Sequence, residues 1–177
     1  MLADDALLQQ VSVLAQACVA ALKAGGKIIF AGNGGSFADA QHLSAEFTSR
    51  FMFDRAPLAS IALGTNNSSI SAIGNDYGYE QVFSRELQGI AHPADVFIPI
   101  STSGNSSNVL TAVKVANELR LGTVAWTGET GGQLLALCEC IRTPSRETAR
   151  IQECHILIGH ILCGLVENLY FSKEHAM

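Results

Sequence analysis

The sequence predicts an α/β protein in which helices cover both faces of a five-stranded parallel sheet. Five short apolar runs alternate with segments of helical periodicity along the 177 residues. The runs are continuously apolar, which is typical of parallel strands buried on both faces. Polar turns follow two of the runs, at the edge where sheets of this kind bind ligands. The pattern therefore predicts a three-layer sandwich with a site at the carboxyl ends of the strands.

The first and last elements are predicted to be long helices. Apolar side chains recur at helical spacing over residues 4–24, and Gly25-Gly26 ends this helix. Another mostly apolar helix is predicted over 147–170. Together with a core over 27–142, these helices form one domain spanning 1–177, a length that suits a single hydrophobic core.

The core alternates between strand and helix. A strand at 27–31 is followed by a helix over 36–52 and a strand at 58–63. After the polar turn at 65–69 we expect a short helix and a loop at 75–78. The remaining elements are expected to be a helix over 80–90, a strand at 95–100, a helix over 106–119, a strand at 123–126, a helix after Gly131-Gly132 and a strand near 138–141.

Charge and composition argue against some classes of binding partner and allow others. The formal net charge is −5 and no Lys/Arg cluster is present, which argues against nucleic-acid binding. No uninterrupted apolar run reaches the length of a membrane span, and Asp4 and Asp5 stand where a secretory signal would be basic. With 48% apolar and 15% charged residues, some surface is available for an oligomer interface.

Five cysteines without framework spacing predict reduced thiols and a cytoplasmic location. Cys138 and Cys140 form a C-x-C within an apolar run. We interpret them, like the other three cysteines, as small buried apolar residues.

A hydroxyl-rich turn connects the strand at 95–100 to the helix at 106–119. It carries Ser101, Thr102, Ser103 and Ser106. Free backbone N–H groups and the positive end of the helix dipole meet at such a turn, and hydroxyl groups add further hydrogen bonds to an oxyanion. The turn is predicted to bind phosphate; the alternative is an ordinary serine N-cap on a surface helix.

A glycine-rich turn at 32–36 follows the first strand and leads into the helix that carries His42 and Glu46. Glycines allow the backbone to approach a ligand closely, but the turn is not a G-x-G-x-x-G motif. His42 and Glu46 are spaced i, i+4 and share one helix face. They could bind a divalent metal or act as an acid–base pair; the alternative is a solvated surface contact.

The last helix places Gln152, His155 and His160 among apolar neighbours. Polar side chains in such a helix need partners. Gln152 and His155 are three residues apart, whereas His160 is about 12 Å further along the axis than Gln152. Spacing therefore favours His155 as the companion of Gln152, and each histidine could instead be a hydrogen-bonded core or interface residue.

Five ordered motifs together resemble the sugar-isomerase (SIS) domain family, and within it the bacterial phosphoheptose isomerases. They are AGNGGS at 31–36, AQHLSAEF at 40–47, GNDYGYE at 74–80, STSGNS at 101–106, and RIQECH with His160. The resemblance implies a flavodoxin-like α/β sandwich and a homotetramer with sites at subunit interfaces. It also implies an aldose–ketose isomerase that converts D-sedoheptulose 7-phosphate to D-glycero-D-manno-heptose 7-phosphate, the first step of heptose synthesis for bacterial surface polysaccharide.

The resemblance also implies roles for individual residues. It assigns a zinc ion to His42, Glu46, Gln152 and His160, choosing His160 where spacing favours His155. Phosphate contacts fall on Ser101, Thr102, Ser103 and Ser106. Further substrate contacts fall on Asn33, Gly34, Gly35, Glu46, Asn75, Asp76 and Gln152.

Enediol chemistry needs a base at carbon and an acid at oxygen. We hypothesise that Glu46 and His160 form this catalytic pair. Arg50 is a candidate partner for substrate oxygens or for Glu46, and equally a surface cation. The chain departs from some relatives in a later N-terminal start and in Ala149, where they carry Asp.

Two other functions share this scaffold. One is a non-enzymatic regulator that binds a replication initiator, a branch that lacks the acidic residue at the position of Glu46. The other is a sugar-phosphate sensor or etherase, which usually carries additional domains or different catalytic loops. The intact His42–Glu46 pair favours the enzyme.

Overall fold

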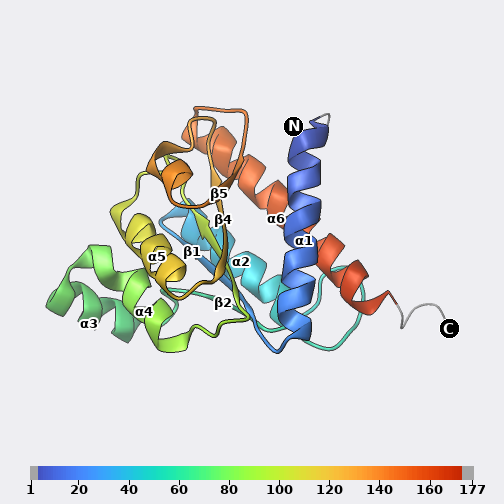
Figure 1. Cartoon of the computed structure of the whole chain (residues 1–177), viewed down its shortest axis with the longest axis horizontal. Helices are drawn as coiled ribbons and strands as arrows, with labels where there is room; N and C mark the ends of the chain where they lie inside the picture. Colours follow the sequence, from blue (N-terminus) through green and yellow to red (C-terminus); the bar gives the residue numbers. More distant parts are fainter. Residues whose placement is uncertain (1–3, 173–177) are drawn as a thin grey trace.

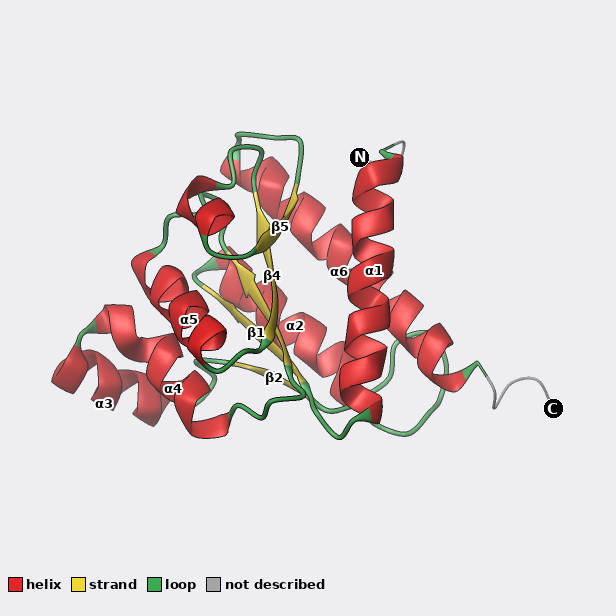
Figure 2. Ribbon diagram, in the orientation of Figure 1, coloured by secondary structure: helices red, strands yellow, loops and turns green. Residues whose placement is uncertain are grey.

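The computed structural model describes residues 4–172, and in them five parallel strands form one sheet in the order β2-β1-β3-β4-β5. Helices lie on both faces (Figures 1 and 2). The strands are β1 (Ile28–Gly32), β2 (Ser60–Ala62), β3 (Val96–Ile100), β4 (Gly122–Thr127) and β5 (Glu139–Arg142). The helices are α1 (Asp5–Lys23), α2 (Gly35–Thr48), α3 (Asn67–Tyr77), α4 (Val82–Ile90), α5 (Ser107–Glu118) and α6 (Thr148–Phe171), with 3-10 turns η1 (Tyr79–Gln81) and η2 (Gly132–Ala136).

Each central strand contributes side chains to two separate cores. In β1, Ile28 and Phe30 join the cluster formed with α1, α2 and α6, whereas Ile29 and Ala31 join the cluster formed with α4 and α5. Successive strand side chains point to opposite faces, so a strand covered on both sides is apolar at every position. The predicted α/β fold with a five-stranded parallel sheet is confirmed.

The sheet register brings the two candidate ligand turns to the same edge. Gly32, the last residue of β1, is paired with Ile100, the last residue of β3. The glycine-rich turn and the hydroxyl-rich turn therefore leave neighbouring strands side by side, as the sequence predicted.

Three local expectations were wrong. Asn75 and Asp76 lie in the last turns of α3 and not in a loop: the Asn66 side chain caps this helix by accepting from the Ser68 and Ser69 N–H groups, and the helix continues to Gly78, whose φ is +92°. Helix α2 ends at Thr48, before the predicted residue 52. The helix after Gly131 is only the 3-10 turn η2.

Two helices, α1 and α6, are long enough and apolar enough to cross a membrane by length and composition. The expectation from uninterrupted apolar runs missed them because scattered polar residues break the runs without lowering the mean hydropathy far. Core helices of globular proteins meet the same criterion, and buried side chains of both α1 and α6 contribute to one core cluster.

Candidate functional site

Three side chains from two helices converge on one point. His42 and Glu46 extend from α2, and His160 extends from α6. The Nε2 atoms of His42 and His160 are 3.0 Å apart, and His42 Nε2 is 3.3 Å from Glu46 Oε1. One ligand atom from each of the three residues lies within 4.8 Å of the other two. Two imidazole nitrogens this close either share one proton or face a common cation.

The donor set fits a divalent metal. Tetrahedral zinc with bonds of about 2.0–2.1 Å places its ligand atoms roughly 3.3 Å apart, close to the observed separations. Two imidazoles and a carboxylate suit zinc and several other divalent ions. The His42 side chain is half exposed, so a cation held by these three donors would be accessible to a further ligand.

Asp39, a residue that sequence reasoning missed, holds Gln152 next to this group. Gln152 Nε2 donates to Asp39 Oδ1 at 2.6 Å, and its side chain lies beside Gly35, where an added Cβ would be 3.5 Å from Gln152 Cγ. Asp39 is buried, and its Oδ2 has no hydrogen-bond partner among the described residues. The 39, 42, 46 spacing, which places all three on one face of α2, was the available signal.

Burial raises the pKa of Asp39, while the hydrogen bond from Gln152 and the charges of His42 and His160 oppose the shift. The carboxylate is thus close enough to both histidines to interact electrostatically. It holds the Gln152 amide nitrogen, which leaves the Gln152 carbonyl oxygen as the atom available to a ligand.

The spacing argument for His155 was wrong. His155 is fully buried, its Nε2 lies 3.2 Å from the Thr127 carbonyl oxygen, and its ring lies near Trp126. On a helix of 100° per residue, His155 lies about 60° to one side of Gln152 and His160 about 80° to the other. Helix α2 packs on the His160 side. Sequence spacing measured the distance along α6 but not which flank meets α2.

The burial of His155 predicts an acid-sensitive fold. Desolvation lowers the pKa of His155 to about 4, although the hydrogen bond to Thr127 opposes the shift. Because the unfolded side chain has a pKa near 6.5, the unfolded state binds more protons between these values. His155 should therefore lower the free energy of unfolding by about 2 kcal/mol when the pH falls from 7.5 to 5.

The measurement is urea unfolding of chelator-treated protein at both pH values, compared with His155→Gln. The variant should be less stable at pH 7.5, but its loss on acidification should be smaller than that of the wild type by that amount. If the wild type and His155→Gln lost equal amounts of unfolding free energy on acidification, the lowered pKa of His155 would be contradicted.

The glycine-rich turn is shaped by its backbone. Gly34 has φ of +55°, a conformation that favours glycine, and a Cβ on Gly32 would lie 2.7 Å from the Ser36 carbonyl oxygen. The Asn33 side chain exchanges two 2.8 Å hydrogen bonds with buried Asn108, and its oxygen also accepts from the Tyr79 hydroxyl at 3.3 Å. Asn108 and Tyr79 fix the amide of Asn33, and sequence reasoning assigned a role to neither.

The hydroxyl-rich turn is not an ordinary serine cap. Ser106 occupies the N-cap of α5, yet its side chain makes no cap hydrogen bond and lies 3.1 Å from the Ser101 hydroxyl. In the first turn of α5 the Val109 N–H donates to Asn108 Oδ1 at 3.0 Å, while Ser106 leaves the N–H groups before it to another acceptor. Thr102 and Ser103 line a cavity of about 250 Å³. These features match an oxyanion site.

Asn75 and Asp76 lie apart from the metal-binding group within one chain. Asn75 Nδ2 donates to Asp76 Oδ1, and both line a surface hollow on α3, at the outer edge of the molecule away from α6 (Figure 1). Arg50 is exposed just beyond α2, and Ala149 is exposed in the first turn of α6.

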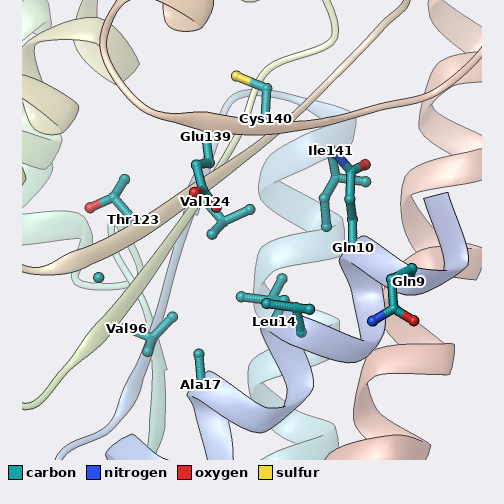
Figure 3. A pocket seen from close by; sticks show the side chains of 12 residues that line it. Gln9, Gln10, Leu14, Ala17, Val96, Thr123, Val124, Glu139, Cys140 and Ile141 are labelled. Atoms are coloured by element: carbon teal, nitrogen blue, oxygen red, sulfur yellow. The ribbon is translucent and has the colours of Figure 1, made fainter. Parts of the chain in front are cut away.

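The largest cavity described, of about 800 Å³, lies elsewhere (Figure 3). Leu14 and Ala17 of α1 form one wall, and side chains of β3, β4 and β5 form the other. It contains none of the candidate residues, and its lining is mainly apolar, with few groups suited to a charged ligand.

Comparison with known proteins agrees with these features. The SIS domain family model matches residues 4–128. The chain is 53% identical to a phosphoheptose isomerase from Aneurinibacillus thermoaerophilus, over 98% of this chain and 88% of the relative. It is 50% identical to that of Burkholderia pseudomallei strain 1710b, over 98% and 89%.

Solved structures give the same result. A phosphoheptose isomerase from Francisella tularensis superposes with a TM-score of 0.86 at 37% identity, covering 89% of this chain and 85% of the other. The Neisseria gonorrhoeae protein gives 0.81 at 42% identity, covering 89% and 86%. The chain therefore belongs to the SIS domain family and, within it, to the phosphoheptose isomerases.

Proposed function

We propose that this protein is an aldose–ketose isomerase that converts D-sedoheptulose 7-phosphate to D-glycero-D-manno-heptose 7-phosphate, the first step of heptose synthesis for surface polysaccharide. The observation that carries the proposal is the convergence of His42, Glu46 and His160 from two helices. The names of the relatives, which match nearly the full chain, support the same reaction.

The reaction moves one proton from C1 to C2 through an enediol and one proton between the two oxygens. In our proposal Glu46 accepts the C1 proton and returns it to C2, while His160 exchanges protons with the oxygens. Asp39 keeps the Gln152 amide oriented toward the site.

Ser101, Thr102, Ser103 and Ser106 bind the phosphate. The energy of that contact holds the reacting end in place. Asn33, Gly34 and Gly35 line the path between the two ends of the substrate, with Asn33 fixed by Asn108.

The proposed cofactor is one Zn²⁺ per subunit, held by His42, Glu46, His160 and the Gln152 carbonyl oxygen. A bound divalent ion would supply positive charge that stabilises the negative oxygen of the enediol. The donor types and spacings support this proposal. Because such donors do not distinguish zinc sharply from other divalent ions, metal identity belongs in the test.

The proposed assembly is a homotetramer with sites at subunit interfaces, in the cytoplasm and without membrane or nucleic-acid partners. Two features support the oligomer. Val13 of α1 and Leu157 and Leu169 of α6 are large apolar side chains left exposed in one chain. Asn75 and Asp76 make no described contact with the other site residues, and in the proposed assembly a neighbouring copy would bring them to a site.

The alternative is a non-enzymatic regulator that binds a replication initiator. That branch lacks the carboxylate at the position of Glu46, whereas here Glu46 lies against His42. A pull-down with the initiator, run beside the isomerase assay, separates the two functions.

Metal removal tests the proposed function. Chelator-treated protein should lose at least 90% of its turnover of sedoheptulose 7-phosphate, followed by NMR, and stoichiometric Zn²⁺ should restore it. The loss is expected because Glu46 and His160, the proposed acid–base pair, are also proposed metal ligands. Unchanged turnover after verified metal removal would contradict the cofactor, and no turnover in any metal-loaded sample would contradict the reaction.

A further inference from the structure

The segment that follows α2 folds back onto a single stripe of α6. The stripe consists of His160, Gly164 and Glu167, spaced i, i+4 and i+7 on one helix face. Residues 49–56 lie beside the C-terminal half of α6 (Figure 1). One end of the stripe is therefore a residue of the candidate metal group, and the other end is a buried carboxylate.

That buried carboxylate anchors the segment. Glu167 accepts hydrogen bonds from the Phe51 N–H at 3.0 Å and the Met52 N–H at 2.7 Å, and it pairs with Arg55 Nε at 2.8 Å. The Glu167 and Arg55 side chains are 1% and 2% exposed. A buried, fully hydrogen-bonded ion pair holds its partners in one arrangement, because breaking it would leave a charge unpaired.

Arg55 extends the anchor to the end of α2. Its guanidinium group donates to the carbonyl oxygens of Glu46 and Phe47 at 2.8 Å each, and to that of Ser49 at 3.2 Å. These carbonyl groups belong to the last turn of α2 and the residue after it, which lack partners within the helix. The backbone on both sides of Phe51 is thus fixed relative to α2 and to α6.

The anchored backbone places the Phe51 ring against His160. The two ring centroids are 5.7 Å apart and the planes are inclined by 23°, a stacked arrangement. The ring lies over Gly164, where an added Cβ would be in ordinary van der Waals contact, 3.5 Å from Phe51 Cε1. The packing fixes the plane of the imidazole from one side.

His160 needs such support. A metal-binding histidine usually donates its second ring N–H to a carboxylate or carbonyl group, which fixes the ring orientation. Nε2 of His160 faces His42. Among residues 4–172, no hydrogen bond holds its other ring nitrogen, and the ring contacts of His160 are with His42 and Phe51.

We propose that Phe51 is a positioning residue that orients the His160 imidazole for metal binding and proton transfer, with the buried Glu167–Arg55 pair holding Phe51 in place. The inference rests on the metal site of the proposed function. Loss of the aromatic face leaves His160 free to rotate about its side-chain bonds, so that its Nε2 spends less time in the donor geometry.

The test compares Phe51→Leu with Phe53→Leu in the chain carrying residues 1–177. Phe53 lies in the same segment, but its ring packs edge-on against Phe171 at 6.3 Å, and Phe171 is about 16 Å further along α6 than His160. Phe51→Trp is the rescue variant, because indole keeps a flat aromatic face. Thermal unfolding of the metal-free proteins shows whether each variant is folded.

The main readout is metal affinity, measured by competition of the metal-free protein with a coloured chelator for Zn²⁺. Outer partners of metal-binding histidines typically contribute 10–100-fold, so Phe51→Leu should raise the zinc Kd by at least about 10-fold. Phe53→Leu should stay within twofold of wild type, and Phe51→Trp should recover most of the affinity. With Co²⁺ in place of Zn²⁺, the visible spectrum of Phe51→Leu should broaden.

Turnover gives a second readout. Phe51→Leu should lower kcat by at least about 10-fold with KM changed less than threefold, since the proposed phosphate contacts do not involve Phe51. A folded Phe51→Leu protein with wild-type zinc affinity, or equal losses in Phe51→Leu and Phe53→Leu, would overturn the inference. A wild-type protein that binds no zinc and shows no turnover would instead refute the proposed function.

Discussion

Glu46→Gln is expected to abolish isomerisation while leaving phosphate-dependent substrate binding nearly intact. The substitution keeps the size and one carbonyl oxygen of the side chain but removes the proton acceptor. General base catalysis contributes about 10²–10⁴-fold, so kcat should fall by about 10³-fold, equivalent to roughly 4 kcal/mol of activation free energy. The serine and threonine contacts to phosphate do not involve Glu46, so the substrate Kd, measured by calorimetry, should change less than threefold.

Two measurements make this result specific. Glu153→Gln is the matched control, because Glu153 is an exposed carboxylate of α6 that pairs only with Arg150 among the described side chains, and it should keep wild-type kcat. Bound zinc is quantified in both variants, since Glu46 is also a proposed metal ligand. Retention of more than a tenth of wild-type kcat by metal-loaded Glu46→Gln would exclude Glu46 as the base.

The fold could be predicted because each strand carried its own signal. β1 is apolar at every position, and its side chains divide between two cores, so no tertiary information was needed to recognise a doubly covered strand. Helix ends were harder to predict. The end of α2 depends on Arg55 and Glu167, more than a hundred residues apart, and no local pattern identifies such a pair.

The site was predictable where one element carried the chemistry. The 42, 46 spacing and the hydroxyl-rich turn are local patterns, and the structure keeps each together. The choice between His155 and His160 depended on which flank of α6 meets α2, and spacing favoured the wrong residue. Phe51 was missed for a related reason, because an aromatic ring is recognised as part of a site only when its neighbours are known. Asp39 did have a local signal, its spacing from His42 and Glu46, but only the structure shows its hydrogen bond with Gln152.

Separate substitutions of His160 and His155 test which of the two histidines belongs to the site. His160→Gln removes one of the three converging donors and the proposed acid at oxygen, so we expect kcat to fall by at least about 10³-fold. Zinc affinity should fall by at least about 10²-fold, because the Phe51 stack cannot orient an amide as it orients an imidazole. Thermal stability of the metal-free protein should change little, since His160 is only partly buried.

His155→Gln should show the reverse. It removes a fully buried ring that packs near Trp126 and hydrogen-bonds Thr127, so the unfolding free energy at pH 7.5 should fall by about 1–3 kcal/mol. At a temperature where the variant is folded, its kcat and zinc Kd should remain within about threefold of wild type, because His155 lies on the flank of α6 opposite to His160. Steady-state kinetics, chelator competition and urea unfolding on the same two proteins separate the roles. If His155→Gln lost metal and turnover while His160→Gln kept both, Gln152 and His155 would be the true companions, and the site would have to lie on the β4 side of α6.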